Sequence, residues 1–371
     1  MGIVDPGKFR ELVGGRRRGA AAALLRLGLR IAEVPYTLAV RWRNYRYDTG
    51  RAEIHQIPVP VVSVGNLTLG GTGKTPMVEW IARWFRQRGV RVTVVSRGYG
   101  AEQGALNDEG RELEARLPDV PHVQNPDRVA GARMAVEEFD CQAIVLDDAF
   151  QHRRIARDVN LVMLDAAAPF GFEHVFPRGL LREPPSGLAR ADFVALSGAD
   201  RVDAAQREAI RRRAAQWAPQ AVWAEVVYAP RRLINASGEE ESLESLANSP
   251  VVAFCGVGNP AGFQHTLQLC GYRVIALREF ADHYRYTRAD VDSLAAWAAR
   301  HQPAAVLCTH KDLVKLGIDR LGNCRLWAVS IGLDFTVGQD ALEQALARLL
   351  PTPDGEPGRG TSLLLPGEDV A

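Results

Sequence analysis

Residues 58–76 read PVPVVSVGNLTLGGTGKTP, and this stretch decides the fold of the 371-residue chain. The β-branched residues 59–64 are typical of a buried parallel strand, whereas residues 77–88 (MVEWIARWFRQR) carry apolar side chains at helical spacing. A glycine-rich turn between a strand and a helix lets backbone N–H groups close on phosphates at the positive end of the helix. The stretch therefore predicts a phosphate-binding loop and a nucleoside triphosphate site.

The loop contains residues with specific expected roles. Its nucleotide-binding residues are predicted to be Leu69, Gly70, Gly71, Thr72, Gly73, Lys74 and Thr75. Lys74 is expected to reach the β- and γ-phosphates, and the Thr75 hydroxyl is expected to bind Mg²⁺. The strict pattern G-x-x-x-x-G-K-[ST] has its first glycine where this chain has Thr68. We expect the other glycines of the loop to provide the curvature; an ordinary glycine-rich turn is the less favoured alternative.

An acidic pair follows an apolar strand pattern further along the chain. Residues 142–146 are apolar and lead into Asp147 and Asp148. A carboxylate at the end of a strand is the usual partner of a phosphate loop, because it holds Mg²⁺ directly or through water. We therefore predict a metal role for this pair, and the alternative is a pair that caps a turn. His152 follows in the same segment, and a lone histidine is more often structural.

Strand and helix patterns alternate along the rest of the chain, which predicts an α/β fold with helices on both faces of a parallel sheet. The sequence around 228–249 is irregular and acidic, as expected of a linker. A second strand–helix alternation follows it. We expect an N-terminal helical segment (1–50), a P-loop core domain (51–227), the linker (228–249), a smaller α/β domain (250–350) and a loose tail (351–371).

The composition describes a soluble, core-forming chain, with 47% hydrophobic and 24% charged residues. The net charge of +1 gives no reason to expect a nucleic-acid partner. None of the five cysteines forms a Cys-x-x-Cys pair, so buried thiols in a reducing, cytoplasmic compartment are expected.

The N-terminal segment 19–40 is apolar but is not expected to span a membrane. Arg26, Arg30 and Glu33 interrupt it on one helical face, and Pro35 is expected to break it. Arginines and aromatic residues flank the segment. Such a basic amphipathic helix suits the surface of an anionic membrane. A helix that docks on the core of the protein itself is an equally supported alternative from these residues alone.

Several motifs together resemble those of the tetraacyldisaccharide 4'-kinases of lipid A biosynthesis, in family order from about residue 10 to 350. They are the loop within residues 62–75, SRGY at 96–99, DDAFQH at 147–152, LREP at 181–184, ADHY at 281–284 and THKD at 309–312. The chain departs from the family pattern at Ala149, where glycine is usual, and at residues 107–110, which read NDEG instead of GDEP.

The resemblance implies transfer of the γ-phosphoryl group of ATP, with Mg²⁺, to the 4'-hydroxyl of an acylated glucosamine disaccharide 1-phosphate lipid. It also implies two α/β/α domains joined by a short β linker, and an N-terminal helix that binds the cytoplasmic face of the bacterial inner membrane. Asp108 is implied as the base, with His283 behind it. Lys74 completes the catalytic set, and Glu183 joins Thr75 and the two aspartates as a candidate metal ligand.

Two other functions remain open from the residues. One is a P-loop kinase of another sugar or small-molecule hydroxyl, and the other is a catalytically inactive, membrane-bound nucleotide-binding protein. A GTPase is disfavoured, because THKD at 309–312 is the nearest approach to the guanine-binding motif Asn-Lys-x-Asp.

Overall fold

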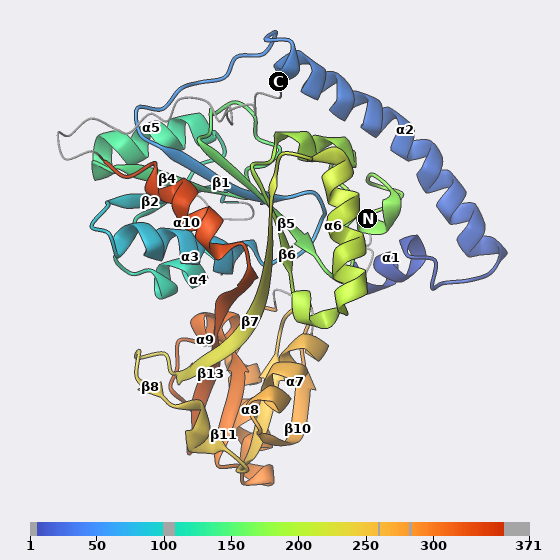
Figure 1. Ribbon diagram of the computed structural model, residues 1–371. Coiled ribbons are helices and arrows are strands. Elements are labelled where there is room, and N and C mark those ends of the chain that lie inside the picture. Colours follow the sequence, from blue (N-terminus) through green and yellow to red (C-terminus); the bar gives the residue numbers. More distant parts are fainter. Residues whose placement is uncertain (1–5, 99–107, 259, 282–283, 352–371) are drawn as a thin grey trace. The chain divides into compact units, whose positions relative to one another are not determined.

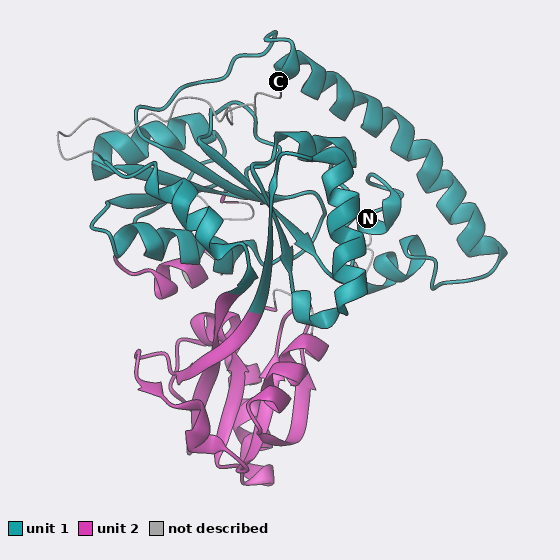
Figure 2. Cartoon of the chain, viewed as in Figure 1, with its two compact units in different colours: residues 1–97, 120–227, 335–371 teal, residues 98–119, 228–334 magenta. Residues whose placement is uncertain are grey.

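The computed structural model describes residues 6–98, 108–258, 260–281 and 284–351 (Figure 1). The chain divides into two compact units. Unit 1 comprises residues 1–97, 120–227 and 335–371, and unit 2 comprises residues 98–119 and 228–334 (Figure 2). The boundaries at 227/228 and 334/335 fall within strands β7 (Val222–Ile234) and β13 (Cys324–Val337). The first residues of the expected linker thus continue strand β7, and the expected tail beyond Pro351 lies outside the described residues.

A parallel sheet forms the centre of unit 1, with β1 (Val61–Asn66) in its middle. The strand order is β7-β6-β5-β1-β4-β2-β3, and each neighbouring pair in this series is parallel. The other bounds are β2 Val92–Ser96, β3 His122–Gln124, β4 Ala143–Asp147, β5 Val159–Asp165 and β6 Phe193–Ser197. Strands β1, β2, β4 and β6 are buried along their whole length, as expected of a sheet covered on both faces. The predicted α/β class is confirmed.

Helices cover this sheet through their apolar faces. Helix α3 (Lys74–Arg86) packs on β1, β2 and β4. Helix α5 (Arg128–Phe139) packs on β2 and β3, and its Val129 and Ala132 share a buried cluster with Val95. The remaining helices of unit 1 are α1 Pro6–Val13, α2 Ala20–Asp48, α6 Ala204–Trp217 and α10 Gln339–Ala347, with short 3₁₀ turns at Gly171–Glu173, Pro185–Arg190 and Ala199–Arg201.

Unit 2 has its own parallel strands, in the order β10-β9-β11-β13. Their bounds are β9 Pro250–Cys255, β10 Arg273–Glu279 and β11 Ala305–Thr309, with β8 Glu240–Glu241 and β12 Arg320–Leu321 as short antiparallel additions to β7 and β13. The helical elements are α4 Asp108–Arg116, α7 Pro260–Leu269, α8 Arg288–His301, α9 His310–Leu316 and a 3₁₀ turn at Leu243–Leu246. A capping box starts α8, since Asp290 N donates to Thr287 Oγ1 at 3.2 Å and Thr287 N donates to Asp290 Oδ2 at 2.9 Å.

Helix α2 corrects one expectation, because it continues through Pro35 to Asp48. Proline in a helix interior removes one backbone hydrogen bond and costs about 3 kcal/mol. Good helix formers extend on both sides of Pro35 in this 29-residue helix, so the local cost does not end it. Among the described residues, no helix is long and apolar enough to cross a membrane.

The polar face of α2, and not its apolar face, meets the rest of unit 1. Arg26 Nη1 donates to the carbonyl of Arg17 at 2.8 Å, and Val175 N donates to Glu33 Oε1 at 2.8 Å. An apolar stripe on the helix remains exposed; its members, spaced three or four residues apart, are Leu24, Leu27, Ile31, Val34, Leu38, Trp42 and Tyr45. The helix therefore presents to solvent the face that an ordinary amphipathic helix would bury.

Candidate active site

The loop between β1 and α3 has the backbone shape expected of a phosphate-binding loop. Gly73 precedes α3 in the left-handed conformation (φ 76°, ψ 28°), and Gly70 also has a positive φ of 111°. Lys74 and Thr75 are then the first two residues of α3, at the positive end of its dipole. Thr72 Oγ1 is buried and lacks a hydrogen-bond partner within the described residues, which is typical of a loop completed by a ligand.

The segment 180–182 fixes the start of this loop. Leu69 N donates to the carbonyl of Leu180 at 2.7 Å, and Arg182 N donates to the carbonyl of Leu67 at 2.7 Å. Thr68 lies between these two bonds, is buried, and forms an antiparallel bridge with Leu181. The departure from the strict glycine pattern thus has a structural reason, because position 68 is part of a strand-like pairing.

Arg10 of α1 lies against this loop, a contact that the sequence pattern did not reveal. A Cβ atom placed on Gly70 would overlap the guanidinium of Arg10. Helix α1 is held in place by its buried residues Leu12 and Val13, and by Arg178 Nη1, which donates to the carbonyl of Val13 at 3.0 Å. Two features therefore require glycine at position 70: its positive φ and the close approach of the Arg10 side chain.

The acidic pair lies at the carboxyl end of β4, beside the loop. Asp147 pairs in register with Val64 of β1, so both strands end at the same edge of the sheet. Lys74 Nζ lies 3.5 Å from Asp148 Oδ1, and Arg182 Nη1 donates to both carboxylate oxygens of Asp148 at 2.8 Å. Burial alone would raise the pKa of Asp148, but Lys74 and Arg182 outweigh it, so the pKa lies below its usual value.

Arg128 binds the backbone of the acidic pair and is a second residue that sequence analysis missed. It is buried, and its Nη2 donates to the carbonyls of Asp147 at 3.3 Å and Asp148 at 2.9 Å. Burial lowers the pKa of Arg128, with the two aspartates opposing that shift. The sequence held one local signal for this role. Arg128 is the first residue of α5, directly after the helix cap Asp127, whose side chain accepts a hydrogen bond from Val129 N.

The turn after Asp148 is held by Arg157. Arg157 Nη2 donates to the carbonyls of Ala149, at 2.6 Å, and His152, and Nη1 donates to the carbonyl of Phe150 at 3.2 Å. Burial and nearby arginines lower the pKa of His152 to about 4, so its ring is neutral near pH 7. This supports the structural role expected for His152.

The predicted metal donors differ in how well their surroundings suit coordination of Mg²⁺. Asp147 is 8% exposed at the end of β4, and Thr75 is the second residue of the neighbouring α3. Within the part of the chain that the structure describes, no three acidic, histidine or cysteine side chains gather as a metal site. Mg²⁺ at phosphoryl-transfer sites usually takes one or two carboxylates together with substrate phosphates. A site shared between protein donors and a triphosphate therefore fits the residues present.

Glu183 differs from the other candidate metal ligands because protein groups already surround its carboxylate. Arg190 Nη2 lies 2.9 Å from both oxygens, Gln151 Nε2 donates to Oε1 at 3.0 Å, and Asn44 Nδ2 donates to Oε2 at 2.9 Å. The side chain of Glu183 is fully buried. We therefore interpret Glu183 as a structural residue that ties α2 and residues 151 and 190 together, and we leave it out of the proposed metal site.

Replacing Glu183 with alanine is expected to lower the free energy of unfolding by about 3–5 kcal/mol, because Arg190 would stay buried without its counter-ion. Urea unfolding followed by circular dichroism measures this loss. The isosteric Glu183→Gln keeps the volume and separates lost charge from lost packing. A Glu183→Ala protein of unchanged stability but altered Mg²⁺ dependence would instead identify a metal ligand.

The two residues implied as base and supporting histidine belong to unit 2. Asp108 is the first residue of α4, and its side chain is not among those the structure describes; His283 lies outside the described residues. Helix α4 itself packs on α9 through buried Glu112. Glu112 lies 3.1 Å from Arg116 and 3.8 Å from Lys311, so charge contacts fix the helix that Asp108 begins.

The THKD segment that contains Lys311 has a structural role in unit 2. Thr309 caps α9, and its hydroxyl donates to Asp312 at 2.6 Å. Asp312 is fully buried and also accepts from Tyr286 Oη at 2.9 Å and from Gly256 N at 3.1 Å. These contacts join β9, α9 and the segment before α8, in place of the guanine contacts of a GTPase.

Comparison with known proteins places this arrangement in one family. The family model described as Tetraacyldisaccharide-1-P 4'-kinase matches residues 25–351. The Tetraacyldisaccharide 4'-kinase of Anaeromyxobacter dehalogenans is 41% identical and covers 89% of this chain and 92% of its own length. That of Chlorobaculum parvum is 34% identical, with 87% and 95% covered.

A solved structure agrees with these relatives. A crystal structure of LpxK from Aquifex aeolicus in complex with ATP has a TM-score of 0.70 and 28% identity, covering 87% of this chain and 99% of that one. The residues 25–351 that the family model matches include the phosphate loop, the acidic pair and the THKD segment. This chain belongs to the tetraacyldisaccharide 4'-kinase family.

Proposed function

We propose that this protein transfers the γ-phosphoryl group of ATP to the 4'-hydroxyl of a tetraacyldisaccharide 1-phosphate in lipid A biosynthesis. The observation that carries the proposal is the position of Lys74 in a member of this family. Lys74 follows the left-handed Gly73, begins α3, and places its ammonium 3.5 Å from Asp148 at the end of the neighbouring strand β4. That is the arrangement in which a lysine meets the terminal phosphates of a nucleotide.

Incubation of the purified chain with γ-³²P-labelled ATP and the disaccharide 1-phosphate lipid in detergent micelles tests this proposal. We expect label in the lipid, on the 4' oxygen. Label that appears only as inorganic phosphate, or on a different acceptor offered in parallel, would contradict it.

The loop and its neighbours are expected to bind and orient the triphosphate. Phosphoryl transfer has a loose transition state, so positioning and charge stabilisation account for most of the catalysis. Backbone N–H groups of residues 70–75 and the ammonium of Lys74 would hold the β- and γ-phosphates, whereas the N–H of Leu69 is already bonded to the carbonyl of Leu180. Thr75 and Asp147 would hold Mg²⁺, with Asp148 beside them, and Mg²⁺ bound there would supply positive charge to the triphosphate.

Asp108 is proposed to accept the proton of the attacking 4'-hydroxyl. A sugar hydroxyl is a weak nucleophile, and a carboxylate within hydrogen-bond reach removes its proton as the bond to phosphorus forms. His283 would orient this carboxylate and tune its basicity. The contact of Glu112 with Lys311 of α9 helps to hold the helix whose first residue is Asp108.

Helix α2 is proposed to bind the membrane that contains the lipid acceptor, as a peripheral anchor on the cytoplasmic face of the inner membrane. Its exposed apolar stripe is the supporting observation, with Leu24 and Ile31 exposed by 69% and 68%. An acceptor with four acyl chains is costly to extract from a bilayer, at about 0.8 kcal/mol per CH₂ group. An enzyme held at the surface reaches the sugar without extracting the lipid.

Introducing glutamate at three positions of the stripe, Leu27, Ile31 and Leu38, is expected to reduce membrane partitioning at least about tenfold, because each buried aliphatic side chain contributes roughly 1.5–3 kcal/mol. The positions are exposed, so the fold should be retained. Flotation with lipid vesicles measures the change, and Glu114→Gln on exposed α4 surface is the control. Unchanged flotation of the triple variant would show that α2 does not insert its apolar face.

A further inference from the structure

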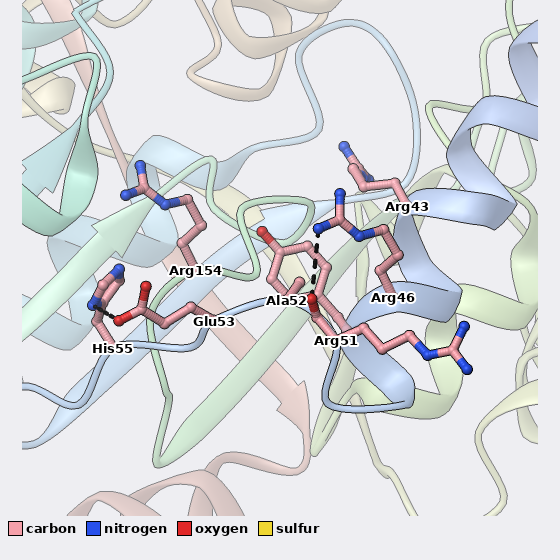
Figure 3. Close-up of a pocket in the computed structure, with 8 residues that line it drawn as sticks. Arg43, Arg46, Arg51, Ala52, Glu53, His55 and Arg154 are labelled. Atoms are coloured by element: carbon pink, nitrogen blue, oxygen red, sulfur yellow. Dashed lines mark hydrogen bonds and ion pairs between the residues drawn. The ribbon is translucent and has the colours of Figure 1, made fainter.

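A basic cavity lies at the carboxyl end of α2, apart from the residues proposed for phosphoryl transfer. It has a volume of about 240 Å³ and is lined by the last turns of α2, by residues 51–55 and by Arg154 after β4 (Figure 3). Four arginines line it, against a single carboxylate, Glu53; they are Arg43, Arg46, Arg51 and Arg154. Three chain segments thus bring an excess of positive charge to one concave surface.

Most of this charge is not neutralised by the protein. Glu53 pairs with His55 at 3.3 Å, and Arg154 pairs with Asp127 at 3.2 Å on a half-exposed surface. The other three arginines have no carboxylate partner within the described residues. Their hydrogen bonds are long: Arg43 Nη2 donates to Asn44 Oδ1 at 3.4 Å, and Arg46 Nη2 donates to the carbonyl of Arg51 at 3.5 Å.

Aromatic rings orient two of these guanidinium groups and leave their N–H edges available. The guanidinium carbon of Arg46 lies 5.2 Å from the centre of the Trp42 ring, and that of Arg51 lies 5.6 Å from the centre of the Tyr45 ring. Stacking limits the rotamers of an arginine without using its fork of donors. Such a fork matches the oxygens of a phosphate group, and several forks around one cavity favour a doubly charged or bridging anion.

The position of the cavity on α2 indicates where that phosphate comes from. Trp42 and Tyr45 end the exposed apolar stripe of α2, and Arg43 and Arg46 alternate with them on the same turns. Aromatic and basic residues together are typical of the head-group level of a membrane. We propose that this cavity binds the phosphate of a membrane-lipid head group, a proposal that rests on the proposed membrane-surface function of α2.

Vesicle flotation of the full chain tests this proposal, with phosphatidylcholine vesicles that contain or lack phosphatidylglycerol. Arg46→Ala/Arg51→Ala is expected to lower partitioning onto the anionic vesicles by about 30-fold, since each basic residue near such a surface contributes about fivefold. Binding to neutral vesicles should change little. The control pair Arg211→Ala/Arg212→Ala removes two exposed arginines from α6 and should have a smaller effect.

A charge-conserving variant distinguishes binding by the arranged guanidinium groups of the cavity from general electrostatic attraction to an anionic membrane. Arg46→Lys/Arg51→Lys keeps both charges but loses the bidentate forks, so the proposal expects a measurable loss of anionic-vesicle binding. Full retention by this lysine variant, or wild-type binding by the alanine variant, would overturn the proposal. Both positions are exposed, and urea unfolding checks that the variants remain folded.

Kinetics in neutral detergent micelles distinguish the two sources of lipid phosphate. If the acceptor's own phosphate occupies the cavity, the alanine variant raises KM for the acceptor and leaves kcat unchanged. If bulk anionic phospholipid occupies it, KM in neutral micelles stays at the wild-type value while vesicle binding falls. Arginine-dependent vesicle binding by a wild-type chain that phosphorylates no lipid would disprove the proposed function and leave the head-group site intact.

Discussion

Replacing Lys74 with alanine is expected to lower kcat for phosphoryl transfer by about 10²–10³-fold, the typical loss when one preorganised charge donor is removed from a transition state. Lys74 begins α3, and its ammonium lies 3.5 Å from Asp148. Its side chain is 14% exposed, so water replaces it poorly at the terminal phosphates. Steady-state kinetics with labelled ATP and the lipid acceptor measure the effect.

The fold should survive this change, because Asp148 keeps both hydrogen bonds from Arg182. Urea unfolding of Lys74→Ala is therefore expected to match the wild type within about 1 kcal/mol. Lys8→Ala, an exposed lysine of α1, is the matched control and should keep wild-type kinetics. Wild-type kcat in Lys74→Ala would mean that the triphosphate binds elsewhere.

Replacing Asp108 with asparagine is expected to lower kcat by about 10²–10⁴-fold, the usual contribution of a general base. The amide has the shape of the carboxylate but cannot accept the proton of the 4'-hydroxyl. Because the phosphate loop belongs to other residues, the dissociation constant of ATP should be unchanged. Initial rates and calorimetric titration with ATP measure the two quantities separately.

The matched control for Asp108 is Glu114→Gln, which makes the same chemical change at an exposed position of α4. It should leave kcat unaffected. A second diagnostic is the pH profile: loss of a carboxylate base removes the acidic limb of the plot of kcat against pH. An Asp108→Asn enzyme that keeps the wild-type kcat and pH profile would exclude Asp108 as the base.

Much of the fold could be predicted because its signals are local. The β-branched run before the glycine loop and the apolar helix after it became β1 and α3, and the carboxylates after residue 146 lie beside that loop. Parallel pairing of buried strands brings their carboxyl ends to one edge, so sequence order alone placed Lys74 near Asp148. The capping box of α8 was predictable for the same local reason.

Long-range contacts of charged side chains could not be predicted in this way. Arg10 reaches Gly70, and Arg128 reaches the carbonyls behind the acidic pair, through tertiary packing that no spacing encodes. Glu183 matched a family motif, yet its surroundings of Arg190, Gln151 and Asn44 became evident only from the structure. The roles of Asp108 and His283 stay predictions.

The expectation that Pro35 would break helix α2 was wrong, because it gave too much weight to the low helix propensity of proline. A single Pro35 does not end a helix with many good helix formers on either side. Arg26 and Glu33 were correctly expected to share one face of the helix. The sequence alone did not determine whether this charged face or the apolar face contacts the rest of the protein. The structure assigns the polar face to the protein and the apolar stripe to solvent.

The structure of the chain crystallised with Mg²⁺ and a non-hydrolysable ATP analogue tests the central claim most directly. The account predicts triphosphate density against the backbone of residues 70–75, with the terminal phosphate at the ammonium of Lys74 and the metal between Thr75 and Asp147. Density for the triphosphate at any other place, with this loop empty, would contradict it.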